Sequence, residues 1–215
     1  MQAEFQRRKS LGRRYSGQSV LAARIVCGDC GDFYGSKVWH SNSKFDDDHQ
    51  CSTPTLDETD VKARFLVAYN SLIDNREALI EDVRLMQETL TNCDQIDTEM
   101  QSLADELSIL AGLLRKCIEQ NASTALDQTD YADRYESLMR RYDTASKRLR
   151  ELDKQKEERT NKATLIGGFL FELMERDQPL EEFDDHLWLV TIDKVIAHHD
   201  GRIVFKFQSG LEVAA

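Results

Sequence analysis

Proline is scarce in this chain. Only 2 of its 215 residues are proline and 10 are glycine. Because proline breaks helices and glycine weakens them, this scarcity favours long helices over one loop-rich globule. There is also no run of about twenty apolar residues, the length that a membrane-spanning helix needs. Five cysteines, an odd number, and no signal-peptide pattern argue against a disulfide framework. We therefore expect a cytoplasmic protein with no membrane partner.

Catalytic motifs are missing as well. The sequence has no glycine-rich phosphate loop, no H-E-x-x-H and no G-x-S-x-G. Its many carboxylates lie mostly on expected helix faces, where solvation is the usual role. We therefore expect no catalytic activity from this chain.

Charge is distributed unevenly. Residues 1–44 hold eight Lys and Arg against three Asp and Glu, a net charge of +5, whereas residues 45–215 carry a net charge of −16. Contact with phosphates depends on a local surface, so the basic N-terminal part can bind DNA although the whole chain is acidic. The alternative is that these basic residues are only a solvated surface.

Three cysteines have the spacing of a zinc site. Cys27 and Cys30 form a C-x-x-C knuckle, and Cys51 follows about twenty residues later. The fourth ligand would be His49, His40 or a residue missing from this sequence. A redox pair is the alternative, and it would need a thioredoxin-like strand before the knuckle and a helix after it.

Short strands are expected around this knuckle. Residues 19–26 and 33–39 read as strands, and either Thr55 or Asp57 is expected to cap the helix that follows. So small a ribbon cannot fold on an apolar core of its own, and metal would supply much of its stability.

Helical spacing begins near residue 58. Apolar residues from Ile96 to Cys117 alternate steps of three and four, and a second such seam runs from Tyr135 to Leu152. Two similar seams with a break between them favour an antiparallel hairpin with its tip near residues 119–129. A parallel homodimer and a helical bundle are the alternatives. Apolar residues near the tip would form a contact surface: Leu113, Ile118 and Leu126. Cys93 and Cys117 are expected to be small core residues.

The C-terminal part is expected to hold a return helix followed by a β-hairpin. Residues 187–197 and 202–207 are strand-like, and Asp200-Gly201 suits a tight turn between them. Phe183, Leu187 and Trp188 are expected to pack against the first long helix. His198 and His199 would point to opposite faces of a strand and are expected to be solvated.

The sequence therefore predicts an α+β fold that is mainly α: a small zinc β-ribbon domain with long helices and an inserted antiparallel coiled-coil hairpin. The expected parts are a basic linker that follows a preceding domain, the zinc β-ribbon, a connecting helix, the coiled-coil arm, and a return helix with a closing hairpin. Their ranges are 1–18, 19–57, 58–91, 92–160 and 161–215.

Basic residues interleaved with aromatic ones are candidates for DNA contacts, through phosphates or base edges. They lie in the linker and the expected ribbon: Arg13, Arg14, Tyr15, Lys37, Trp39, Ser41 and Lys44. A second reading makes the chain a coiled-coil protein-interaction module with a purely structural metal staple. A redox enzyme is a third.

Five segments, spread over essentially the whole chain, form a recognisable combination. They are Arg13-Arg14-Tyr15-Ser16-Gly17, Ile25-Val26-Cys27-Gly28-Asp29-Cys30-Gly31, Tyr34-Gly35-Ser36-Lys37-Val38-Trp39-His40-Ser41, Cys51-Ser52-Thr53-Pro54, and the tail with Phe183-Asp184, Leu187-Trp188 and Asp200-Gly201-Arg202-Ile203-Val204-Phe205-Lys206-Phe207. Together they resemble the large serine recombinases, the integrases and transposon recombinases of phages and mobile elements.

This resemblance implies a function. The ribbon would bind half of a double-stranded DNA attachment site, and the coiled coil would pair recombinase subunits and control integration versus excision. The nucleophilic serine lies in a separate domain of such proteins, so this chain would bind DNA without cutting it, in a bacterial or phage-encoded, nucleoid-associated protein.

The resemblance also assigns zinc ligands. Cys27, Cys30 and Cys51 correspond to three of the four zinc cysteines. The family pattern has a further strand and cysteine between the positions of Lys44 and Phe45, and that stretch is missing here.

Overall fold

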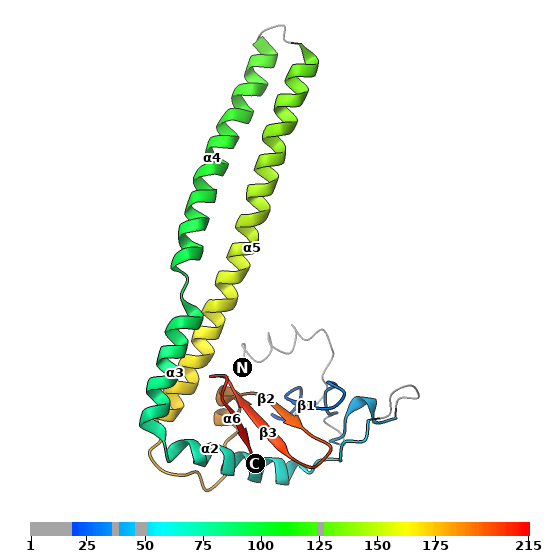
Figure 1. Ribbon diagram of the computed structural model, residues 1–215, viewed down its shortest axis with the longest axis vertical. Helices are drawn as coiled ribbons and strands as arrows, with labels where there is room; N and C mark the ends of the chain where they lie inside the picture. The colour runs from blue at the N-terminus through cyan, green and yellow to red at the C-terminus, as the bar shows by residue number, and fades with distance from the viewer. Residues whose placement is uncertain (1–18, 36–38, 46–50, 124–126) are drawn as a thin grey trace. The chain divides into compact units, whose positions relative to one another are not determined.

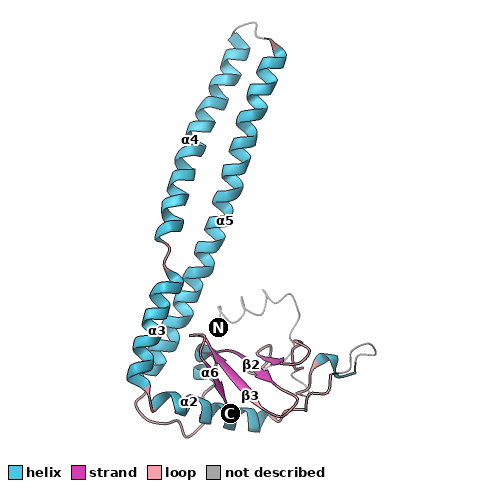
Figure 2. Ribbon diagram, in the orientation of Figure 1, coloured by secondary structure: helices cyan, strands magenta, loops and turns pink. Residues whose placement is uncertain are grey.

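The computed structural model describes residues 19–35, 39–45, 51–123 and 127–215 (Figure 1). The chain divides into two compact units. The first combines Met1–Gln87 with Thr164–Ala215, and the second is Glu88–Ala163. The second unit is therefore inserted between the two halves of the first. The described residues are mainly helical with one four-stranded sheet, which confirms the expected α+β class (Figure 2).

The sheet of the first unit joins the knuckle to the C-terminal part. Its strands are ordered β1 (Ile25–Cys27), β2 (Ile192–Ala197), β3 (Ile203–Phe207) and β4 (Glu212–Ala214). β1 is parallel to β2, and the other neighbours are antiparallel. The turn between β2 and β3 contains Gly201 with φ of +84°, a conformation that favours glycine, as Asp200-Gly201 predicts.

Strands near the knuckle are shorter than expected. Residues 19–24 form turns, with Ala23 at a positive φ of 61°, so β1 begins only at Ile25. Of the strand expected over residues 33–39, the described residues 33–35 and 39 belong to no named strand, and Phe33 and Tyr34 make isolated bridges with Val26 and Ser41. The turn at Ala23 breaks the extended backbone that a longer first strand would need.

The tail differs from the expected hairpin at its start. Residues 185–191, of which 187–191 were expected to be strand, form helix α6 (Asp185–Thr191). A short apolar run does not distinguish a strand from a helix, and the cap decides here. The Asp184 carboxylate accepts a hydrogen bond from the Leu187 amide at 3.0 Å. At the other end the buried Arg24 side chain donates to the carbonyls of Leu189 and Ile192.

Two helices replace the single connecting helix expected over residues 58–91. They are α2 (Glu58–Ile73) and α3 (Arg76–Thr91). Asp57 caps α2 by accepting hydrogen bonds from the amides of Thr59 and Asp60, which confirms one of the two expected caps. The break falls at Asp74 and Asn75, residue types whose side chains compete for backbone hydrogen bonds and favour helix ends.

An aromatic cluster forms the core of the first unit. The Phe65 ring of α2 lies 5.1 Å from the Trp188 ring and 5.5 Å from the Phe183 ring. Trp188 is fully buried, and its indole N–H donates to the Val20 carbonyl at 3.2 Å. The expected packing of the tail on the first long helix is confirmed.

The second unit consists mainly of two antiparallel helices, α4 (Asp94–Ser123) and the first part of α5 (Gln128–Glu175). Buried side chains from both helices line their contact: Ile96, Leu110, Cys117, Ala145 and Leu152. Ion pairs cross between acidic residues of α4 and basic residues of α5: Asp97 with Lys156, Glu99 with Arg148, and Glu106 with Arg141. From pair to pair the residue number in α4 rises as the residue number in α5 falls, which is the pattern of two antiparallel helices. The two helices of one chain therefore pair with each other. The sequence favours this arrangement over a parallel homodimer.

α5 is longer than either helical segment expected for it. The seam to Leu152 and the return helix after Thr160 are parts of one 48-residue helix. No proline or glycine interrupts residues 128–166, so nothing in the backbone chemistry ends the helix there. It ends at Glu175, four residues before the helix-breaking Pro179. No described helix has the combination of length and apolar character that crossing a membrane requires.

Candidate metal centre

The knuckle begins at Cys27, the last residue of β1. The chain turns back so that the Gly31 amide donates to the Cys27 carbonyl at 3.0 Å, with Gly31 at φ of +77°. The amides of Asp29 and Cys30 point at the Cys27 sulfur, with N–Sγ distances of 3.3 and 3.4 Å. These two contacts fix the position of the Cys27 sulfur within the turn.

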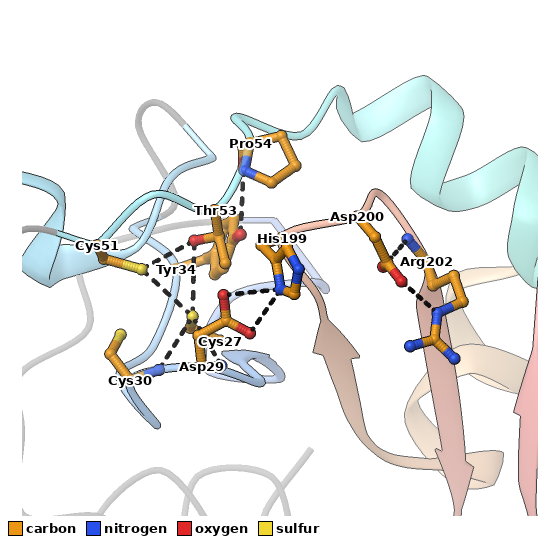
Figure 3. Close-up of polar contacts among 10 residues, drawn as sticks. All are labelled: Cys27, Asp29, Cys30, Tyr34, Cys51, Thr53, Pro54, His199, Asp200 and Arg202. Carbon is orange, nitrogen blue, oxygen red and sulfur yellow. Dashed lines mark hydrogen bonds and ion pairs between the residues drawn. The ribbon is translucent and has the colours of Figure 1, made fainter.

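Cys51 reaches the knuckle from the segment before α2. Its amide donates to the Ser43 carbonyl, and its Sγ lies 3.4 Å from the Cys27 Sγ. The sulfurs of Cys27, Cys30 and Cys51 all lie within 4.8 Å of one another (Figure 3). Cys27 and Cys51 are buried and Cys30 is exposed. Three soft sulfur donors this close together can hold a metal ion.

Two buried hydroxyls support the sulfurs. The Thr53 Oγ1 lies 3.0 Å from the Cys51 Sγ and 3.5 Å from the Cys27 Sγ, so one side chain contacts both buried thiols (Figure 3). The Ser41 Oγ lies 3.2 Å from the Cys30 Sγ. Ser41 and Thr53 are both almost inaccessible to solvent. These contacts orient the sulfurs as second-layer hydrogen bonds do in metal sites.

The surroundings shift the pKa values of two of the three thiols in opposite directions. Burial acts to raise the pKa of Cys51, but hydrogen bonds with the Thr53 side chain and backbone and with the other two thiols outweigh it and lower the pKa to about 6. Burial raises the pKa of Cys30, against opposing hydrogen bonds with Ser41 and Asp32. Cys51 is therefore the thiol that its surroundings favour as a thiolate.

The turn between β2 and β3 supports the knuckle from the side. The Gly28 amide donates to the Ala197 carbonyl, and a Cβ on Gly28 would lie only 2.6 Å from the His198 ring. The His199 Nδ1 lies 3.3 Å from an Asp29 carboxylate oxygen. Both histidines, expected to be merely solvated, therefore contact the knuckle. The sequence does not predict the contact between His199 and Asp29, because the two residues lie about 170 positions apart in the chain.

The fourth ligand is not identified. Among the described residues, the cluster of potential ligands contains only the three cysteines. His40 donates its Nδ1–H to the Ser41 carbonyl at 2.9 Å and is not part of the cluster, and His49 lies outside the described residues. A strand precedes the knuckle, but the described residues 28–35 after it form turns and isolated bridges in place of the helix that a thioredoxin-like redox pair would need.

The expected DNA-contacting residues fall into three groups. Arg13, Arg14, Tyr15 and Lys37 lie outside the described residues, and Lys44 lies in the 3-10 helix η1 (Asn42–Phe45). Trp39 is 7% exposed, and its indole N–H donates to the Glu58 carboxylate at 3.2 Å. Ser41 is fully buried beside Cys30. Because both side chains are buried, Trp39 and Ser41 do not present a surface to DNA, which corrects the expectation for these two.

The expected tip residues of the second unit are partly exposed. Ile118 is 50% exposed and Leu113 is half-buried, while Leu126 lies outside the described residues. Ile109, which the sequence reasoning missed, is 64% exposed. It lies farther from the tip near residues 119–129 than Leu113 and Ile118 do.

Comparison with models of known protein families finds no match, and comparison with curated proteins and with solved structures finds none either.

Proposed function

We propose that this chain is the DNA-binding and synapsis-regulating part of a large serine recombinase, acting in site-specific DNA recombination. The observation that carries the proposal is the order of its parts. The three-thiol cluster lies beside β1, β1 pairs with β2 of the tail, and two antiparallel helices are inserted between them. This is the order that the sequence resemblance implies.

The metal in this proposal is zinc in a β-ribbon. Three thiolates suit zinc, and a structural zinc site takes a fourth protein ligand. Solvent can reach the cluster at Cys30, which is exposed. Because the strands around the knuckle are short, bound zinc would supply folding free energy to this part of the chain.

DNA contact would come from the basic N-terminal side. Arg13, Arg14, Tyr15, Lys37 and Lys44 lie in the part of the sequence with a net charge of +5. Residues 45–215, with a net charge of −16, would be repelled by phosphates. Binding should therefore be local and strongly dependent on salt.

The two helices of the second unit would form a coiled coil that pairs recombinase subunits. α4 contains six acidic residues and two basic ones. Three of these acidic residues form ion pairs with α5 of the same chain. Contact with another subunit would therefore use the exposed apolar side chains of the helices. The candidates are Leu113, Ile118 and Leu126, joined by the exposed Ile109.

A coiled-coil interaction module with a structural metal staple is the second candidate. The observations that favour it are the acidic character of most of the chain and the burial of Trp39 and Ser41. In that case the chain would self-associate without binding DNA.

Selection from a duplex DNA library at several salt concentrations tests the proposal. We expect the zinc-loaded chain to select a half-site, and Arg13→Ala/Arg14→Ala to weaken binding and lower the salt slope by about 2. The matched control is Lys147→Ala/Arg150→Ala, which removes the same charge from α5 and should leave affinity unchanged. Absence of DNA binding with preserved self-association would instead support the interaction module.

A further inference from the structure

The two buried sulfurs of the cluster lie almost in contact. The Cys27 and Cys51 Sγ atoms are 3.4 Å apart, and the Thr53 hydroxyl contacts both. A disulfide holds its sulfurs about 2 Å apart, so the two sulfurs must approach by about 1.4 Å to reach bonding distance. Cys27 lies in β1 and Cys51 lies in the segment before α2, so a disulfide would link these two segments.

We propose that Cys27 and Cys51 form an intramolecular disulfide when the metal is absent and a small disulfide oxidant such as oxidised glutathione is present. The cluster is then a redox-sensitive site as well as a metal centre. This inference uses the same thiols as the proposed zinc site, but it does not depend on DNA binding.

The third thiol provides a route for the reaction. Cys30 is the exposed member of the cluster, and its sulfur lies within 4.8 Å of the other two. The Cys30 thiolate attacks one sulfur of oxidised glutathione, forms a mixed disulfide and releases one glutathione thiolate. A buried cysteine thiolate then attacks the Cys30 sulfur and releases the second glutathione.

Exchange within the cluster completes the step. The remaining thiolate attacks its buried neighbour, forms the Cys27–Cys51 bond and returns Cys30 to a thiol. Overall, two cysteine thiols lose two electrons and two protons, and one oxidised glutathione becomes two reduced glutathione molecules. The product is the buried pair, which glutathione reaches less easily than Cys30.

Metal binding and this disulfide exclude each other. The bond uses two of the three sulfurs in the cluster, and a disulfide sulfur is not a thiolate ligand. Bound zinc should protect the pair, and oxidation should prevent zinc from binding. The remaining cysteines, Cys93 and Cys117, are not part of the cluster.

Oxidation of the full chain with oxidised glutathione, followed by alkylation and peptide mapping, tests the proposal. In the metal-free chain we expect one internal disulfide that joins Cys27 to Cys51. Cys51→Ser should abolish this bridge, and the control Cys93→Ser/Cys117→Ser should retain it. Cys30→Ser should give the same bridge more slowly. Preloading with zinc should prevent the reaction, with bound zinc measured on the same sample.

Other outcomes would overturn the proposal. They are a Cys27–Cys30 or Cys30–Cys51 bridge as the final product, no internal bridge, or equally fast oxidation of a chain shown to hold zinc. If the chain forms the Cys27–Cys51 bridge but does not bind DNA, the redox inference stands and the proposed function fails.

Discussion

Thr53 is the side chain that joins the two buried thiols of the metal centre. Its hydroxyl lies within 3.5 Å of both the Cys27 and the Cys51 sulfurs. Replacing Thr53 with valine keeps the shape of the side chain but removes the hydroxyl. We predict that Thr53→Val weakens zinc binding about tenfold or more, as loss of outer-layer partners does in other metal sites. Competition with a chromophoric chelator measures the affinity.

Thr129→Val is the control for this prediction. Thr129 is exposed at the start of α5 in the second unit. This variant should bind zinc like the unmodified chain. Equal zinc affinity for all three proteins would show that the Thr53 hydroxyl does not support the sulfurs.

Asp184 gives a prediction about pH. Its pKa is lowered, chiefly by the hydrogen bond from the Leu187 amide and further by the Arg176 guanidinium 3.2 Å away. A carboxylate with a lowered pKa stabilises the fold above its unfolded pKa of about 4, and this contribution is lost as the pH falls through the folded pKa.

We therefore predict that Asp184→Asn, which keeps a capping oxygen, is less stable than the unmodified chain at neutral pH. Because the side chain is 37% exposed, the difference should be about 1 kcal/mol or less. It should shrink toward zero in acid. Urea unfolding at a series of pH values measures it, with the exposed Asp177→Asn as control. A difference that does not change with pH would contradict the role of the charge.

The sequence identifies the three clustered cysteines but not the residues that support them. Cys27, Cys30 and Cys51 follow from a spacing that metal sites share. Ser41 does not, because it reaches Cys30 only where the chain folds back between them. Gly28 and His198 do not either, because they lie about 170 residues apart in the chain. For Trp39 the prediction from the sequence was wrong. An aromatic residue among basic ones indicated a surface for DNA, yet burial and a hydrogen bond to Glu58 make it part of the core.

At the scale of elements, the seam between α4 and α5 depends on a few fully buried residues. Leu110 is 1% exposed, whereas its neighbour Ile109 is 64% exposed. We predict that Leu110→Ala destabilises the helix pair by about 2–5 kcal/mol, because it leaves a cavity in the seam. Ile109→Ala should change stability by no more than about 0.5 kcal/mol. Thermal unfolding followed by circular dichroism compares the two variants, and similar losses in both would contradict the pairing.

Periodicity predicts long elements better than short ones here. The spacing from Ile96 to Cys117 indicated a helix with a buried seam, and α4 covers it. The run Leu187 to Val190 was expected to be a strand, because four apolar residues fit either type, and the Asp184 cap makes it helical. The break at Asp74 and Asn75 was also missed, since the apolar spacing continues on both sides of it.

At the scale of the whole molecule, the first unit is assembled from two distant parts of the chain. Its core contains Phe65 from the first part and Trp188 from the second, and β1 pairs with β2 across the insertion. A deletion variant that lacks residues 88–163 should therefore keep this core. Gln87 lies beside Gly167, so a short glycine linker can join the two parts.

We predict that this shortened chain folds and binds one zinc ion, and that it loses self-association. Circular dichroism, zinc stoichiometry and sedimentation measure these properties, with the full chain as reference. An unfolded product, or one that still self-associates, would contradict the division into units.

In the proposed function, the three-thiol centre organises a DNA-binding unit. The most direct test is a titration of zinc into the metal-free, reduced chain in the presence of a selected duplex, with DNA affinity measured at each step. We predict that affinity rises until one zinc ion is bound per chain, and that Cys51→Ser shows no such rise. DNA affinity that is independent of zinc would contradict the claim.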